Sequence, residues 1–218
     1  MTQPVSRPVA GSVLVAASAI GASYLGVRSQ RAAALDGAAG RVLHRSLGAA
    51  PDRLLGAVTD LGSVYGLGGV TAALAVSGHR RRAADVFVAG SLAWIAAQGA
   101  KPLLRRDRPY LDATGATRLV AVPAGSSWPS GHAAVVAAIA GALGPLPTAA
   151  RIGTAGVVAG VGASRVYVGV HHLTDVVAGF GVGVLSAVAG RALVGAATRW
   201  PPTAGTAHRL VGRAEALG

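Results

Sequence analysis

The sequence lacks cysteine and has few acidic residues. Without cysteine, the chain can form neither disulfides nor thiolate metal sites. Aspartate and glutamate together number 8 of the 218 residues, and the one glutamate is Glu215. The aspartates are spread thinly along the chain, whereas a magnesium or two-metal site needs several oxygen ligands close together. We therefore expect this protein to use no metal and no other cofactor.

Lysine is equally scarce, because Lys101 is the only one and every other strongly basic side chain is arginine. An ammonium group is a compact point charge, whereas a guanidinium is a planar fork. A single lysine in an arginine-rich chain therefore indicates that position 101 requires the compact cation.

The composition is that of a membrane protein. Hydrophobic residues make up 52% of the chain and charged residues 13%, and the mean hydropathy is positive. These values are typical of a chain that crosses a bilayer several times. The net charge of +12 could indicate nucleic-acid binding, but the basic residues are scattered between apolar runs. Little polar sequence remains for a nucleic-acid module, so we expect no nucleic-acid partner.

Apolar runs about long enough to cross a bilayer recur along the chain. They predict an all-α, polytopic membrane bundle of about six transmembrane helices. We expect one membrane domain over residues 1–190, followed by a basic C-terminal tail over 191–218. The predicted spans are 9–27, 54–78, 84–104, 132–146, 152–170 and 173–190.

Two segments in the first quarter of the chain allow a second interpretation. The run 9–27 could be a signal peptide cleaved after Ala17-Ser18-Ala19, but its apolar character continues past that point, so a retained span is favoured. Residues 28–53 place leucine and valine on one helical face and arginine on another, which predicts an amphipathic helix in the membrane interface. A solvated loop is the alternative for this segment.

The arginine-rich loops predict which end of the bundle faces the cytoplasm. Short basic loops tend to stay on the cytoplasmic side. With six spans, the loop 79–82, Arg151 and the tail all lie on that side, while the arginines of 28–53 lie opposite and violate the rule. The loop 105–129 and the turn 166–172 then share the extracytoplasmic face. The expected location is a bacterial cell membrane, and the oligomeric state is left open.

Three short blocks bring ionisable residues into this apolar chain, where they are costly without a partner or a function. The blocks are Lys101-Pro102-Leu103-Leu104-Arg105-Arg106-Asp107-Arg108-Pro109, then Pro129-Ser130-Gly131-His132, then the stretch from Ser164-Arg165 to Asp175. In the third block, His171 and Asp175 are four residues apart, so on a helix the carboxylate can orient the imidazole. A helix cap with a polar neighbour is the alternative, and His172 also lies within one turn of Asp175.

In order and spacing, the three blocks resemble the signature of the type 2 phosphatidic-acid phosphatase superfamily. That family includes lipid phosphate phosphatases, polyprenyl diphosphate phosphatases, glucose-6-phosphatase and vanadium haloperoxidases. Its pattern is lysine, six residues and Arg-Pro; then Pro-Ser-Gly-His; then Ser-Arg, five residues, histidine, three residues and aspartate. Every specified position is filled between Lys101 and Asp175, about a third of the chain.

The resemblance implies roles for eight residues. His171 would attack phosphorus and form a phosphohistidine, Asp175 would orient it, and His132 would act as general acid and then general base. The expected phosphate-binding residues are Lys101, Arg108, Ser130, Gly131 and Arg165. Elementary chemistry agrees, because cations and a helix start can stabilise the charge that phosphoryl transfer places on the equatorial oxygens.

The resemblance implies a lipid phosphate or isoprenoid phosphate substrate, with membrane lipids around it, and leaves three alternatives open. One is a membrane phosphotransferase of the same chemistry, and another is a non-catalytic membrane protein with a vestigial anion site. A vanadate-dependent oxidase shares the motif but is disfavoured, since the known forms are larger and soluble. Outside the motif, Arg105 and Arg106 are expected to lie at the membrane surface or to steer anions, with no catalytic role. Trp128 is expected to be an interfacial aromatic residue.

Overall fold

The computed structural model describes residues 7–44, 46–111, 116 and 118–199, and this part of the chain is helical with no strand. The described helices are α1 (Arg7–Arg28), α2 (Ala33–Leu43), α3 (Ala49–Asp60), α4 (Val64–Val76), α5 (Arg80–Ala100), η1 (Lys101–Leu103), η2 (Pro109–Leu111), α6 (Gly131–Ala142), α7 (Thr148–Tyr167) and α8 (Leu173–Arg199). The prediction of an all-α bundle is confirmed.

The six predicted apolar runs overlap, in order, the helices α1, α4, α5, α6, α7 and α8, and the second run also covers part of α3. Among the described residues, three helical segments are long and apolar enough to cross a membrane: Val9–Arg28, Arg80–Leu103 and Leu173–Arg199. The apolar helices α4 and α6 are shorter, at 13 and 12 residues. The count of six spans therefore stays a prediction.

Three predicted boundaries were wrong. The run 54–78 is not one helix, because α3 ends at Asp60 and α4 starts afresh at Val64. Ser63 caps this new start, since its hydroxyl accepts hydrogen bonds from Tyr65 N and Gly66 N, both at 3.2 Å. The segment 28–53 forms α2 and the first turn of α3 rather than one helix, and α8 continues past Arg191 to Arg199.

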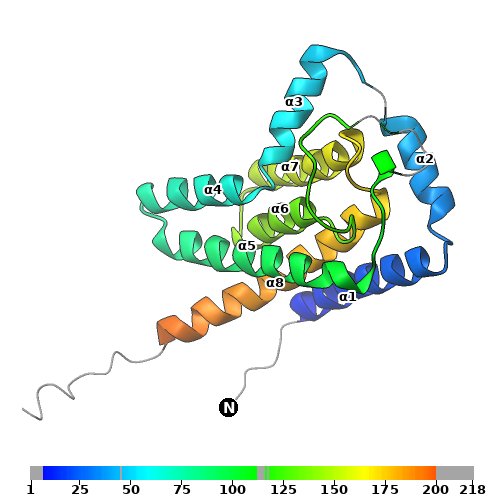
Figure 1. Ribbon diagram of the computed structural model, residues 1–218. Helices are drawn as coiled ribbons and strands as arrows, with labels where there is room; N and C mark the ends of the chain where they lie inside the picture. The colour runs from blue at the N-terminus through cyan, green and yellow to red at the C-terminus, as the bar shows by residue number, and fades with distance from the viewer. Residues whose placement is uncertain (1–6, 45, 112–115, 117, 200–218) are drawn as a thin grey trace, which may run out of the picture.

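Helix α8 runs through the middle of the bundle and packs against α1, α5 and α6 (Figure 1). Its contact with α6 depends on glycine. A side chain at Gly179 would strike the carbonyl oxygen of Ser130, and one at Gly183 would strike that of Ala134. Small residues of this kind let two helices approach closely inside a membrane. The packing thereby holds the start of α6 against the first turns of α8.

The core between α4, α5, α6 and α8 is built mainly from small side chains, including Val86, Ala93, Ala138 and Ala187. Large apolar side chains such as Leu14, Ile95 and Ile152 are exposed on the outside. A soluble protein would rarely show so many, but a helix facing lipid gains from them.

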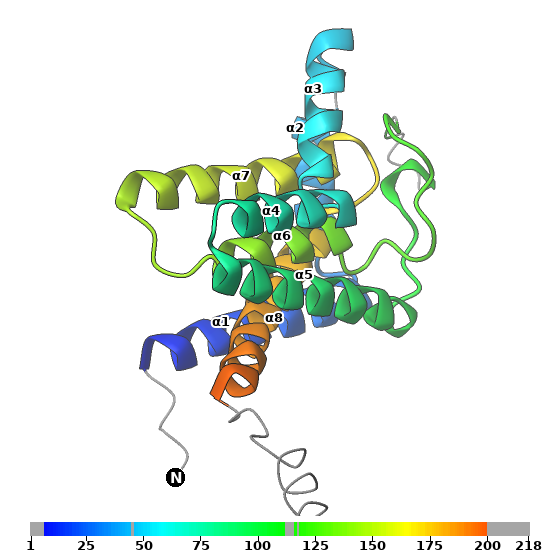
Figure 2. The same cartoon turned by 90° about the vertical axis from the view of Figure 1, so that its left-hand side faces the viewer.

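The helix ends fall into two groups (Figure 1). On the left of the view lie the α4–α5 and α6–α7 turns and the C-terminal end of α8, and the start of α1 lies below the middle of the bundle, at the left end of that helix. The ends of α5 and α7, the starts of α6 and α8, the loop after η1 and helix α2 lie on the right. Figure 2 shows α3 projecting away from the bundle. All three signature blocks therefore meet at one end of the molecule, and the basic segment 79–82, at the start of α5, lies at the other.

Candidate active site

A cavity of about 340 Å³ lies where the three signature blocks meet. Six of the eight predicted site residues line it: Lys101, Arg108, Gly131, His132, Arg165 and His171. The other two, Ser130 and Asp175, are completely buried. Ser130 precedes the lining residue Gly131 in the chain, and Asp175 faces the lining residue His171. The structure thus brings together residues that are up to about 70 positions apart in the chain.

Arg108 is buried and held almost entirely by backbone carbonyl groups. It donates to Val170 O at 2.8 Å, to Ala124 O at 3.1 Å and to Gly125 O at 3.2 Å. These bonds tie the first block to the loop before α6 and to the turn that carries His171. Because carbonyl oxygens are neutral, the guanidinium keeps its full charge for an anion in the cavity.

Lys101, the first residue of η1, and Arg165 of α7 approach the same cavity. The Lys101 ammonium donates to Ser126 O at 2.6 Å, and Arg165 Nη1 donates to Thr59 Oγ1 at 2.9 Å. Arg165 is only 3% exposed, and its Nε has no hydrogen-bond partner among the described residues. A buried cation without a carboxylate partner is costly, so this donor is available to a bound anion.

Ser130 and Gly131 form the start of α6. Ser130 is the N-cap residue, yet its buried hydroxyl makes no hydrogen bond within the described part of the chain. Its backbone N–H donates to Asp175 O at 3.0 Å, which fixes this helix start against the start of α8. The unpaired N–H groups of a first helical turn favour an anion, and Gly131 exposes them to the cavity.

His171 follows α7 in the turn before α8, and Asp175 lies in the first turn of α8. His171 Nδ1 is 3.6 Å from Asp175 Oδ2, slightly longer than a hydrogen bond. Burial lowers the pKa of His171 to about 3, although the neighbouring carboxylate opposes that shift. The imidazole is therefore neutral near pH 7, and a neutral imidazole has a lone pair that can attack an electrophile.

The same carboxylate shows why His171 and His172 differ. Asp175 Oδ2 accepts a hydrogen bond from the backbone N–H of His172 at 2.8 Å, so His172 contacts it through the main chain. The His172 ring instead places Nε2 3.3 Å from Asp107 O. His171 lines the cavity and His172 does not. Residue spacing left both histidines open, and the geometry favours His171.

Arg106 was wrongly predicted to lie at the membrane surface. Its Nη1 donates to Asp175 Oδ1 at 2.6 Å, and its Nη2 donates to Asp36 Oδ2 at 2.6 Å. Asp36, a buried residue of α2, also accepts from Thr174 N at 2.9 Å. Arg106 therefore links the candidate catalytic carboxylate to α2, and sequence analysis missed both Arg106 and Asp36.

Trp128 was also placed wrongly, because it is buried at 2% exposure instead of lying in the interface. Its indole N–H donates to Ser23 Oγ at 3.0 Å, and Ser23 in turn donates to Thr174 O at 2.8 Å. This chain of hydrogen bonds connects α1, the Pro129-Ser130-Gly131-His132 block and the start of α8. Trp128 thus supports the position of the second block.

The described residues contain no group of three or more histidine, aspartate or glutamate side chains that could hold a metal ion. Asp175, which faces the candidate nucleophile, and Asp36 are both paired with Arg106. Positive charge in the cavity comes instead from Lys101, Arg108 and Arg165.

A family model of the PAP2 superfamily matches residues 82–199, more than half of the chain. The chain belongs to this superfamily. All three blocks fall within the matched segment, which extends from the first turn of α5 to the end of α8. The predicted resemblance is therefore confirmed.

Two solved structures share the fold. A transmembrane PAP2-type phosphatidylglycerolphosphate phosphatase from Bacillus subtilis is 20% identical, with a TM-score of 0.71, over 87% of this chain and 98% of that one. LpxE from Aquifex aeolicus is 22% identical, with a TM-score of 0.62, over 69% of this chain and 91% of that one. No curated protein sequence matches the chain. The PAP2-superfamily chain is a membrane helical bundle.

Proposed function

We propose that this PAP2 protein is a metal-independent phosphatase that hydrolyses a lipid phosphate or a polyprenyl (di)phosphate through a phosphohistidine. The observation that carries the proposal is one cavity where a neutral His171 meets three cations, none of which forms an ion pair with a carboxylate of the described structure, although Asp60 also lines the cavity. Such a cavity attracts a phosphate and stabilises the charge that develops during its transfer.

In the first step, His171 Nε2 attacks phosphorus in line with the leaving oxygen. Asp175 faces Nδ1, which fixes the hydrogen on that nitrogen and leaves the lone pair on Nε2. As the phosphorus–oxygen bond breaks, the protonated form of His132 donates its proton to the departing alcohol or phosphate oxygen and becomes neutral. The products of this step are the free leaving group and phosphorylated His171.

In the second step, the now neutral His132 takes a proton from water, and the resulting hydroxide attacks phosphorus. The phosphorus–nitrogen bond breaks, inorganic phosphate leaves and His171 returns to its neutral form. Lys101, Arg108, Arg165 and the α6 start hold the equatorial oxygens in both steps. Two moderate barriers then replace one direct hydrolysis.

A lipid substrate is favoured by the surroundings of the cavity. The site lies at the ends of apolar helices, so a head group can enter while its tail stays in the membrane. A structural neighbour is named as a phosphatidylglycerolphosphate phosphatase, which agrees with a lipid-linked phosphate. The arginine-rich segment 79–82, at the start of α5, lies at the opposite end, which favours a site on the extracytoplasmic face of a bacterial membrane.

The direct test is phosphate release by the purified protein from a panel of lipid monophosphates and diphosphates in detergent. We expect release from at least one of them, with no release by the His171→Asn variant. Transfer of the phosphoryl group to a lipid acceptor without phosphate release would indicate a phosphotransferase. A folded wild-type protein that releases nothing from the panel would contradict the proposal.

A further inference from the structure

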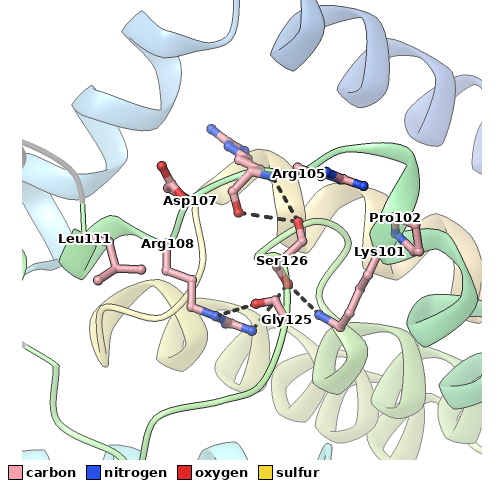
Figure 3. A pocket seen from close by; sticks show the side chains of 9 residues that line it. Lys101, Pro102, Arg105, Asp107, Arg108, Leu111, Gly125 and Ser126 are labelled. Atoms are coloured by element: carbon pink, nitrogen blue, oxygen red, sulfur yellow. Dashed lines mark hydrogen bonds between the residues drawn. The ribbon is translucent and has the colours of Figure 1, made fainter.

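A second cavity adjoins the cavity that contains His171, which we call the reaction cavity. It has a volume of about 460 Å³, which is in the range of small-ligand sites. Lys101 and Arg108 line both cavities, so these two cations form the boundary between them. Figure 3 shows both side chains converging on the Gly125–Ser126 backbone from opposite sides. Two anionic groups joined by a short bridge could therefore occupy the two cavities at once.

The second cavity has an excess of positive charge. Four basic residues line it: Lys101, Arg105, Arg106 and Arg108. Of these, Arg106 is neutralised by Asp36 and Asp175, whereas Lys101 and Arg108 bond to backbone carbonyl groups. The one acidic lining residue is Asp107. Three cations without a carboxylate partner and one carboxylate therefore line this cavity, and a bound anion would bring the net charge of the cavity closer to zero.

Arg105 distinguishes the second cavity from the first. It lines the second cavity but not the reaction cavity. Its side chain is exposed and makes no hydrogen bond or ion pair to any residue that the structure describes. Figure 3 places it on the side of Lys101 and Pro102, while Asp107 lies on the side of Leu111. Its guanidinium can therefore bind an anion in this cavity without breaking an existing contact.

We propose that the second cavity is an anion subsite for a second phosphate of the substrate. Arg105 determines the preference for a substrate with two phosphates over one with a single phosphate. The proposal rests on the phosphatase function proposed above. Lys101 and Arg108 contact both phosphates, whereas Arg105 contacts only the one that is not transferred. The second phosphate is joined to the first either directly, as in a diphosphate, or through a short organic bridge.

The test compares substrates that share a tail but differ in the second phosphate. Farnesyl phosphate and farnesyl diphosphate test the direct link, and phosphatidate and phosphatidylglycerol phosphate test the bridged one. In each pair, kcat/KM is measured for the wild type, for Arg105→Gln and for Arg31→Gln. Arg31 is a suitable control because it is exposed in the α1–α2 connection, at the same end of the bundle, and lines neither cavity.

We expect the wild type to prefer the two-phosphate member of at least one pair. Arg105→Gln should reduce that preference about tenfold, the effect of losing one charge-assisted hydrogen bond, and Arg31→Gln should leave it unchanged. Equal losses of kcat/KM for both substrates of a pair would mean that Arg105 acts on the membrane surface in general, and would overturn the proposal. An unchanged preference in Arg105→Gln would overturn it too.

A binding measurement separates failure of this inference from failure of the proposed function. Methylenediphosphonate should raise the apparent melting temperature of the wild type more than methylphosphonate does. The extra shift should shrink in Arg105→Gln and persist in Arg31→Gln. This result requires no turnover, so it holds even if no lipid in the panel is hydrolysed. Equal shifts from the two compounds in the wild type would overturn the subsite.

Discussion

Arg106 Nη1 lies 2.6 Å from Asp175 Oδ1, on the side of the carboxylate away from His171. The other end of the same guanidinium binds Asp36 of α2. This planar bridge fixes the carboxylate that faces the candidate nucleophile, because a guanidinium can bind two acceptors in a rigid geometry. Helix α2 therefore contributes to the site through Asp36, which holds the positioning residue Arg106 against Asp175.

Replacing Arg106 by glutamine should lower kcat about 10- to 100-fold, the range expected from losing a charge-assisted hydrogen bond that orients a reacting group. KM should change less, since Arg106 is tied to carboxylates and does not line the reaction cavity. Arg106→Lys should recover only part of the activity, because an ammonium cannot bridge both carboxylates with the same geometry. The measurement is steady-state phosphate release, with Arg31→Gln as the control for loss of charge. Full activity in Arg106→Gln would show that the bridge does not position His171.

The two adjacent histidines should respond differently to the same substitution. His171→Asn should reduce turnover by at least about 10,000-fold, because it removes the nucleophile, while the protein still inserts in the membrane. His172→Asn should retain most of the activity, since the interaction of His172 with Asp175 is made by its backbone N–H. Phosphate release and membrane fractionation check both variants. The opposite ranking would move the nucleophile to His172.

Activity should survive metal removal. The cavity is served by three cations and a helix start, and the described residues offer no metal-ligand cluster. Phosphate release should therefore be the same with and without EDTA, and vanadate should inhibit by occupying the phosphate site. A strict requirement for magnesium, restored by its re-addition, would contradict the metal-free mechanism.

The close contact between α6 and α8 makes a stability prediction. A methyl group at Gly183 would strike the carbonyl oxygen of Ala134, while nothing lies within 4 Å of one at Gly153. Gly183→Ala should destabilise the protein by about 1–3 kcal/mol, because overpacking forces the helices apart. Gly153→Ala in α7 is the matched control and should have little effect. The apparent melting temperature in detergent measures both, and equal values would show that the contact is not tight.

The sequence predicts the parts of this molecule that are local. Apolar runs located the six main helices because hydropathy is a property of consecutive residues. The signature blocks named eight candidate residues that the structure brings together, because family resemblance carries long-range information that spacing alone does not. The helix break at 61–63 was missed, although Ser63 is a capping residue. The apolar run hid the signal, and the packing that favours the break, such as the close approach of Gly62 to His132 O, joins distant segments.

Partners that are remote in the chain were beyond sequence reasoning. Arg106 and Asp36 are 70 positions apart, and Trp128 and Ser23 are 105 positions apart. Nothing in the local pattern distinguishes Arg106, which is bridged between two carboxylates, from Arg105, which has no such partner. Only the folded structure shows that Arg106 bridges two carboxylates and Arg105 does not.

The central claim is that His171 carries the phosphoryl group during turnover. The most direct measurement is rapid acid-free quenching of the wild type with a lipid phosphate labelled in the transferred phosphoryl group, followed by peptide mapping of any bound label. We predict a base-stable, acid-labile label on His171 that forms and decays at rates compatible with turnover and is absent from His171→Asn. Turnover at a normal rate with no labelled enzyme, or with the label on another residue, would contradict the account.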